Sequence, residues 1–203
     1  MYIESKGLRE FEELIRQLGG SVEPSAASAI NDTALFARKL GSQEIRRLIN
    51  FKAGYIDGGR LTITKRATAR NLEAAITGRD RPTSLARFAQ GQPTFGKQRT
   101  PPRVRVSARG GSQTMRRAFF IRLRRGNAVI TAENANVGLA IRLAEGERID
   151  NKNTMGPLGG NLYLLYGPSV GQVFRTVAEK SADQVGDALA ERFSHYLRRS
   201  TGG

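Results

Sequence analysis

The sequence predicts an α+β fold with N-terminal helices, a central, mainly antiparallel β-sheet and a long C-terminal helix. Apolar residues recur at helical spacing near both ends, while polar and apolar residues alternate in short runs between them. Runs of strands bounded by helices favour α+β architecture. A chain of 203 residues with 39% hydrophobic residues suffices for one domain, or one domain plus an arm, but not for two full-sized domains. We expect an N-terminal helical segment packing on the core (1–53), a β-sheet core with basic loops (54–166), and a C-terminal helix with a short tail (167–203).

Three helices are expected before the sheet. The first covers 7–18 and ends at Gly19-Gly20, a pair that favours helix termination. The second is alanine-rich and begins near Pro24-Ser25, because proline suits the first helical turn. We expect Gly41 to break it, with Ser42 as the N-cap of a short third helix that reaches Asn50.

Short alternating runs predict the strands, and Gly, Pro, Asn and Ser predict the connections between them. The expected strands cover 60–65, 71–77, 103–107, 119–124, 128–131, 137–143 and 162–166. One helical turn is expected at 84–88, a hairpin turn at Gly126-Asn127, and loops at 91–102 and 145–160. The last strand leads through Gly167-Pro168-Ser169 into a single long helix that ends near Arg198.

Positive charge is concentrated in the middle of the sequence. The chain carries 33 Lys and Arg against 18 Asp and Glu, a net charge of +15. No acidic residue occurs from Arg81 to Ala132, whereas these 52 residues contain 12 Lys and Arg. Such a block predicts one strongly basic surface, and therefore a polyanionic or acidic partner.

Composition excludes several kinds of chemistry. Without cysteine there is no disulfide, zinc finger or thiol nucleophile. The one histidine, His195, has no acid nearby except Glu191, so we interpret it as a surface or interface histidine. The acid pairs Glu12-Glu13 and Glu145/Glu147 are interpreted as solvated side chains. We therefore expect no enzyme activity, metal or cofactor.

The segment from Gly91 to Gln98 resembles a phosphate-binding P-loop incompletely. Gln98 stands where that loop needs a hydroxyl for Mg²⁺, and Pro101-Pro102 prevents a helix from following at once. We interpret the segment as an exposed loop. Neither the N-terminal 15 residues nor any other stretch predicts a signal peptide or a membrane span.

The arginine block supplies the candidate binding residues. We expect them to line a sheet face or a loop edge and to contact either nucleic-acid phosphates or an acidic protein neighbour, two alternatives that the sequence leaves equal. Single-strand binding would need aromatic residues among the arginines, and only Phe119 and Phe120 are close. The candidates are Arg103, Arg105, Arg116, Arg117, Arg122, Arg124 and Arg125.

Three groups of segments resemble the minor tail protein Z family of tailed bacteriophages, the tail-completion proteins. They are AINDTA (29–34) with LTITKRAT (61–68) and NLEAAI (71–76), then GRDRPTSLARF (78–88), then LLYGPSV (164–170) leading into a terminal helix. The resemblance extends over about residues 5–198. It implies a structural, non-enzymatic virion protein at the neck or upper tail.

The resemblance also implies partners and a location. Such a protein forms a ring with itself, usually hexameric, between head–tail connector or stopper proteins and tail tube or terminator proteins. Genomic double-stranded DNA can pass through its channel, and assembly takes place in the host cytoplasm without a membrane. Tyr166, Gly167, Pro168, Ser169 and Val170 match the family motif as a strand-to-helix turn, in which Gly167 supplies backbone freedom and Pro168 sets the first helical turn.

A free basic nucleic-acid-binding protein, such as a packaging factor, is the alternative function. A tail-completion protein would occur in purified particles at a fixed low copy number, whereas this alternative need not.

Overall fold

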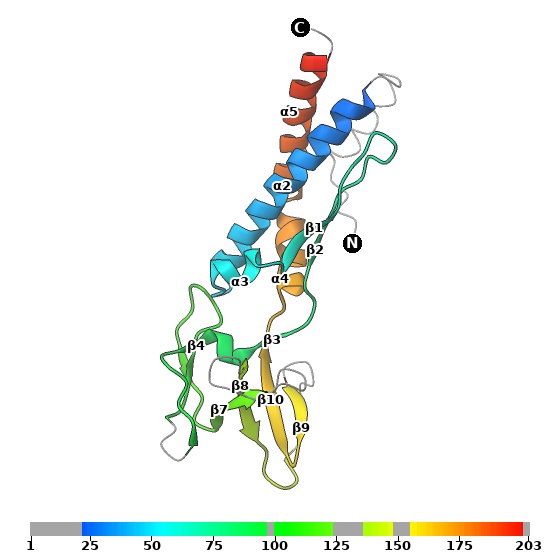
Figure 1. Cartoon of the computed structure of the whole chain (residues 1–203). Coiled ribbons are helices and arrows are strands. Elements are labelled where there is room, and N and C mark those ends of the chain that lie inside the picture. Colours follow the sequence, from blue (N-terminus) through cyan, green and yellow to red (C-terminus); the bar gives the residue numbers. More distant parts are fainter. Residues whose placement is uncertain (1–21, 97–99, 124–135, 148–154, 201–203) are drawn as a thin grey trace. The chain divides into compact units, whose positions relative to one another are not determined.

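The computed structural model describes residues 22–96, 100–123, 136–147 and 155–200. Helices and antiparallel sheets make up the chain, which confirms the α+β prediction (Figure 1). It divides into two compact units: unit 1 contains residues 1–45, 52–80 and 170–203, and unit 2 contains 46–51 and 81–169. Unit 1 therefore brings together segments from both ends of the sequence.

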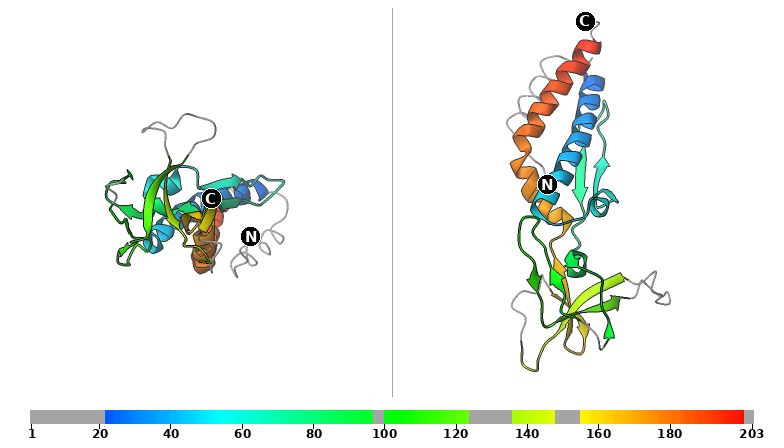
Figure 2. Two further views of the ribbon diagram at one scale, coloured as in Figure 1. Left: turned by 90° about the horizontal axis from the view of Figure 1, so that it is seen from below. Right: turned by 90° about the vertical axis from the view of Figure 1, so that its left-hand side faces the viewer.

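Unit 1 is built mainly from helices, with one hairpin beside them. Helices α2 and α5 lie side by side (Figure 2), and Val22, Ala26 and Ala29 pack with Leu189 and Phe193 in their core. Small alanine side chains on α2 let the larger α5 side chains approach closely. The elements are α2 (Glu23–Leu48, whose last three residues belong to unit 2), α3 (Ala53–Asp57), β1 (Leu61–Lys65), β2 (Ala75–Gly78), α4 (Val170–Lys180) and α5 (Ala182–Ser200).

Helix α2 begins as predicted, with Pro24 in its first turn, but it does not break at Gly41. A Cβ at Gly41 would lie 2.7 Å from the Phe174 ring, so the missing side chain makes room for α4. Ser42 is buried inside the helix, and its hydroxyl donates to the Asp57 carboxylate at 2.9 Å instead of capping a helix. Tertiary packing therefore overrides the glycine signal.

The C-terminal helical prediction is confirmed for Val170–Ser200, with a division that the sequence did not indicate. Helix α4 ends at Lys180, and Ser181 separates it from α5. The buried side chains Val173, Phe174 and Val177 form the inner face of α4.

The β1–β2 hairpin is braced by a side chain of α2. Strand β1 is close to its predicted bounds, while β2 is shorter than expected and pairs Leu61 with Gly78. The Asn31 amide donates to the Ala67 carbonyl at 2.9 Å, and its carbonyl accepts from the Ala67 N–H at 2.9 Å. One amide thus satisfies both backbone groups of a buried residue beyond the end of β1.

Unit 2 holds two small antiparallel sheets. The larger has the order β3–β10–β8–β7, with β9 also paired to β10, and the smaller has the order β4–β5–β6. Leu139, Ala140, Leu164 and Phe88 are buried in its core, where the Phe88 ring lies 5.2 Å from that of Phe51. The strands are β3 (Thr83–Ser84), β4 (Ala89–Gln90), β5 (Arg103–Val104), β6 (Gln113–Thr114), β7 (Ala118–Leu123), β8 (Asn136–Arg142), β9 (Met155–Gly159) and β10 (Leu162–Gly167).

Several sequence predictions for unit 2 are confirmed: the strands β7, β8 and β10 and the single helical turn, a 3₁₀ turn at Leu85–Phe88. The loop predicted at 145–160 is wrong at its end, because Met155–Gly159 forms β9. Its Pro157 has no N–H to donate and is tolerated on an outer strand. The predicted strand 103–107 is regular only over its first two residues, although Ser107 forms an isolated bridge with Ile49. The predictions for 7–18 and 126–131 lie outside the described residues.

Within the described part of the chain, no helix is both long and apolar enough to span a membrane.

Candidate polyanion-binding surface

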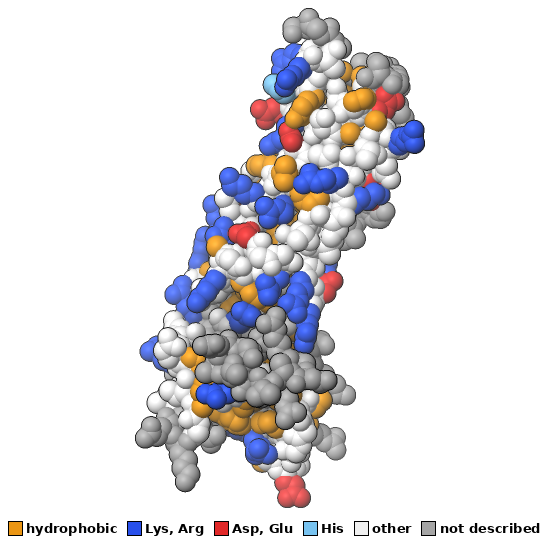
Figure 3. Space-filling view, viewed as in Figure 1, with side chains coloured by type: hydrophobic (Ala, Val, Ile, Leu, Met, Phe, Trp, Pro, Cys, Tyr) orange, Lys and Arg blue, Asp and Glu red, His pale blue; other side chains and the backbone are white. Residues whose placement is uncertain are grey.

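The two units differ sharply in charge. The sequence of unit 2 contains 17 Lys and Arg against four Asp and Glu, so it carries +13 of the total +15 and leaves +2 for unit 1. In the view of Figure 3, described Lys and Arg side chains are seen on each unit, so the contrast between the units comes from the sequence. Unit 2 is therefore the place to look for a polyanion-binding surface.

Arg103 lies at the centre of a polar row on the smaller sheet. It pairs directly with Gln90 on one side and Thr114 on the other. Directly paired residues share one face of a sheet, and all three are exposed, whereas Val104 on the opposite face is 5% exposed. The outer face of β4–β5–β6 thus presents an amide, a guanidinium and a hydroxyl, with neither an acid nor a large apolar side chain in the row.

Arg116 and Arg117 occupy the two central positions of a tight turn between β6 and β7. The turn is closed by the Ala118 N–H, which donates to the Met115 carbonyl at 3.0 Å. Both arginines are exposed. No hydrogen bond or ion pair joins the Arg116 guanidinium to another residue in the described ranges.

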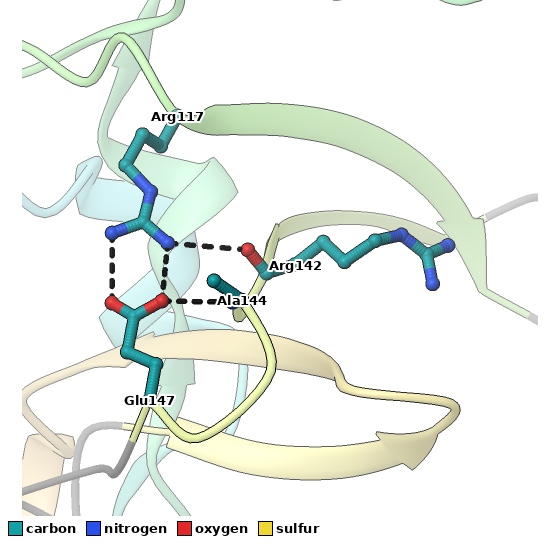
Figure 4. A network of polar contacts seen from close by, with 4 residues as sticks. All are labelled: Arg117, Arg142, Ala144 and Glu147. Carbon is teal, nitrogen blue, oxygen red and sulfur yellow. Dashed lines mark hydrogen bonds and ion pairs between the residues drawn. The ribbon is translucent and has the colours of Figure 1, made fainter.

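Arg117, in contrast, makes its hydrogen bonds to other residues of the protein (Figure 4). Its guanidinium nitrogens lie 2.8 and 2.6 Å from the two Glu147 oxygens, and it donates to the Arg142 carbonyl at 3.3 Å. Glu147 also accepts from the Ala144 N–H at 2.9 Å. Since two-pronged Arg–carboxylate pairs fix geometry, Arg117 secures the turn after β8 and is a poor candidate for an external ligand.

Hydrogen bonds in this network shift the pKa values of Glu147 and Arg117. The bond from Arg117, and after it the bond from the Ala144 N–H, lower the pKa of Glu147 to about 2. The same carboxylate raises the pKa of Arg117. Glu147 is therefore a charged structural group, not merely a solvated acid as expected from the sequence.

Arg105 is also used internally. Its side chain is half-buried, its Nε donates to the Ser107 carbonyl at 3.5 Å, and its guanidinium donates to the Ala108 carbonyl. These bonds shape the segment 105–108, which pairs with residues at and just after the end of α2: the Asn50 N–H donates to the Val106 carbonyl, and the Ala108 N–H donates to the Leu48 carbonyl. Arg105 stabilises this part of the fold.

Arg122 lies over an aromatic ring. Its guanidinium carbon is 4.9 Å from the centre of the Phe95 ring, which in turn is 6.4 Å from the ring of Phe120. Phe120 is 7% exposed and belongs to the buried core. Stacking restrains Arg122 while its N–H groups stay in solvent.

The remaining predicted residues lie elsewhere or cannot be placed. Arg124 and Arg125 lie outside the described residues. His195 is exposed on α5, and its ring lies 5.6 Å from that of Tyr196. In the P-loop-like segment, β5 and not a helix follows after Pro102, while Lys97 and Gln98 lie outside the described ranges.

The motif Tyr166–Val170 carries the chain from β10 into α4, and two expected details are wrong. Gly167 does not adopt a left-handed backbone; a Cβ there would lie 2.8 Å from the Phe88 ring, so the residue is small for packing. Pro168 precedes the helix, which begins at Val170.

Sequence reasoning missed Phe95 and the pairing of Glu147 with Arg117. Phe95 is an aromatic residue in a Gly- and Pro-rich loop, and that unusual setting is its only local signal. Glu147 lies 30 residues from Arg117 and outside the acid-free stretch, so no spacing pattern could connect them. Among the described residues, no group of three or more His, Cys, Asp or Glu side chains could hold a metal ion.

No family model matches the sequence, and no curated protein or solved structure matches it significantly.

Proposed function

We propose that this chain is a structural, non-enzymatic protein of a tailed-phage virion, which forms a ring, completes the tail and helps to join it to the DNA-filled head. The segments that resemble tail-completion proteins carry this proposal, because they contact one another within each unit.

In unit 1, Asn31 of the first segment bonds to Ala67 of the segment that follows β1. The Gly171 N–H, next to the third group, donates to the carbonyl of Arg79 in the second at 2.9 Å. Segments far apart in the sequence thus meet through hydrogen bonds to backbone groups, as expected of residues that specify a fold.

In unit 2, the second and third groups pair again. Ser84 lies opposite Tyr166, and Thr83 lies opposite Gly167, where β3 joins β10. The Phe88 ring fills the space beside Gly167. The resembling residues therefore support a shared scaffold better than a catalytic site, and a scaffold is what a ring subunit needs.

A free basic nucleic-acid-binding protein is the second candidate, favoured by the +13 charge of unit 2. In that case the positive charge would serve nucleic-acid binding alone, and the protein would not be a component of the virion.

Deletion of the gene from the phage genome that encodes this chain tests the proposal. We expect electron microscopy of the lysate to show full heads beside unattached tails, and a plasmid copy of the chain to restore joined particles. Normally joined particles in the deletion lysate would reject the tail-completion function and leave the free nucleic-acid-binding protein.

A further inference from the structure

We infer that unit 2 binds the phosphate backbone of double-stranded DNA through Arg103, Arg116 and Arg122, without reading the bases. This inference rests on the proposed function, which brings the protein next to packaged DNA, and it decides between the two partner classes that the sequence leaves equal.

The internal contacts separate the seven candidate arginines into two groups. The guanidinium group of Arg105 donates to the Ala108 carbonyl, and that of Arg117 donates to the Glu147 carboxylate. Arg103, Arg116 and Arg122 are exposed, and no acidic side chain in the described ranges pairs with them. These three keep their N–H groups for an external anion.

The surroundings of Arg103 favour phosphate over protein. A protein interface has an apolar core inside a polar rim, whereas phosphates are bound by guanidinium, amide and hydroxyl donors. The row Gln90–Arg103–Thr114 supplies those donors. Among the described residues, the exposed large hydrophobics are Leu35, Leu48 and Leu158, and none lies in this sheet.

The aromatic residues favour a duplex over a single strand. Bases of single strands stack on open aromatic faces. Here the Phe95 ring is half-buried and covered by Arg122, and Phe120 is buried. Paired bases remain stacked on one another, so backbone contacts alone suffice for a duplex.

A matched pair of triple variants tests the inference. In the first, R103Q, R116Q and R122Q remove three charges from unit 2. In the second, K39Q, R66Q and R70Q remove three exposed charges from unit 1, so both variants have the same net charge. Fluorescence anisotropy measures the affinity of the full chain for 30-bp duplexes of two unrelated sequences at increasing NaCl.

We expect the wild-type chain to bind both duplexes equally, and the unit 2 variant to bind about tenfold or more weakly at 100 mM NaCl. Each phosphate contact contributes about 0.9 to the slope of log affinity against log salt, so the slope should fall by about 2 to 3. The unit 1 variant should keep the wild-type slope. If the unit 2 triple variant does not fold by circular dichroism, R103Q and R116Q alone should each lower the slope by about 1.

Equal behaviour of the two triple variants would overturn the inference, as would the absence of wild-type binding at 50 mM NaCl. Displacement of the duplex by an equal charge of poly-glutamate would also overturn it and indicate an acidic protein partner. Because this assay needs no virion, DNA binding can survive a failure of the deletion test, and the reverse also holds.

Discussion

The backbones of Gly78 and Gly171 lie so close that a Cβ at position 78 would be 2.7 Å from the Cα of Gly171. The first glycine ends β2, and the second is the second residue of α4. The Gly171 N–H donates to the Arg79 carbonyl at 2.9 Å, and Arg175 reaches Asp80 at 2.7 Å one turn later. This contact attaches α4 to the hairpin within unit 1.

G78A should therefore destabilise the protein by about 1–3 kcal/mol, because the added methyl group meets backbone atoms that cannot rotate away. Urea unfolding would measure the loss. G54A is the matched control, since nothing lies within 4 Å of its new Cβ; it should leave the midpoint unchanged or raise it slightly. Equal midpoints for G78A and wild type would contradict the close contact.

Removal of the Glu147 charge should destabilise the fold in a pH-dependent way. The folded pKa of Glu147 is lowered to about 2 from its usual 4.5, so its contribution is complete above the unfolded pKa and is lost as pH falls between these values. Unfolding of E147Q and wild type should differ above pH 5 and converge near pH 2. Since the pair is solvent-exposed, 1 M NaCl should reduce the difference, whereas a gap independent of both pH and salt would argue against the ion pair.

The Tyr196 hydroxyl should stabilise the α2–α5 pair through Asp32, which it reaches at 2.5 Å. Y196F should lower the midpoint of unfolding, because the Asp32 carboxylate loses this donor. The hydrogen bond to Asp32, followed by burial, raises the pKa of Tyr196; its contribution is therefore present at neutral pH and is lost only as pH rises above the ordinary value of about 10.

Thermal unfolding of Y196F and Y163F provides the comparison for that hydroxyl. The Tyr163 hydroxyl has no hydrogen-bond partner among the described residues. Y163F should therefore keep the wild-type midpoint at pH 7. A similar loss in both variants would show that the Asp32 bond contributes nothing specific.

N31A should loosen the hairpin at one identifiable amide. The Ala67 N–H would lose its acceptor and exchange with solvent faster, since among the described residues it donates to the Asn31 side chain alone. Hydrogen exchange followed by NMR would measure this. The amide of Arg79, which donates to the Arg60 carbonyl at 2.8 Å at the other end of the hairpin, should keep its rate; faster exchange at both positions would indicate general unfolding.

Local patterns predicted the elements whose signals were strong, such as the alternation in β7, β8 and β10 and the proline at the start of α2. These local patterns gave wrong predictions where contact with a residue distant in the sequence determines the local structure. Gly41 reads as a helix end because the sequence does not show the Phe174 ring that needs its space. Gly167 likewise reads as a flexible turn residue, although Phe88 explains its size.

The candidate surface was predicted at the level of charge and not of individual arginines. An acid-free stretch marks a basic region whatever its fold. Which guanidinium groups remain available depends on partners such as Glu147 and the Ala108 carbonyl, which fold back onto Arg117 and Arg105. Turn geometry determines those partners, and a count of charged residues gives no information about turn geometry.

Salt should act in opposite directions on the two contacts that we propose for this chain, one with DNA and one with copies of itself. Copies can approach through unit 1 with little repulsion, because its sequence is nearly neutral, while each copy of unit 2 adds +13. Repulsion between such copies extends over about 8 Å at physiological ionic strength. Several copies of unit 2 can therefore lie close together only with counter-ions or a polyanion between them. Higher ionic strength, which weakens DNA binding, would at the same time favour self-association.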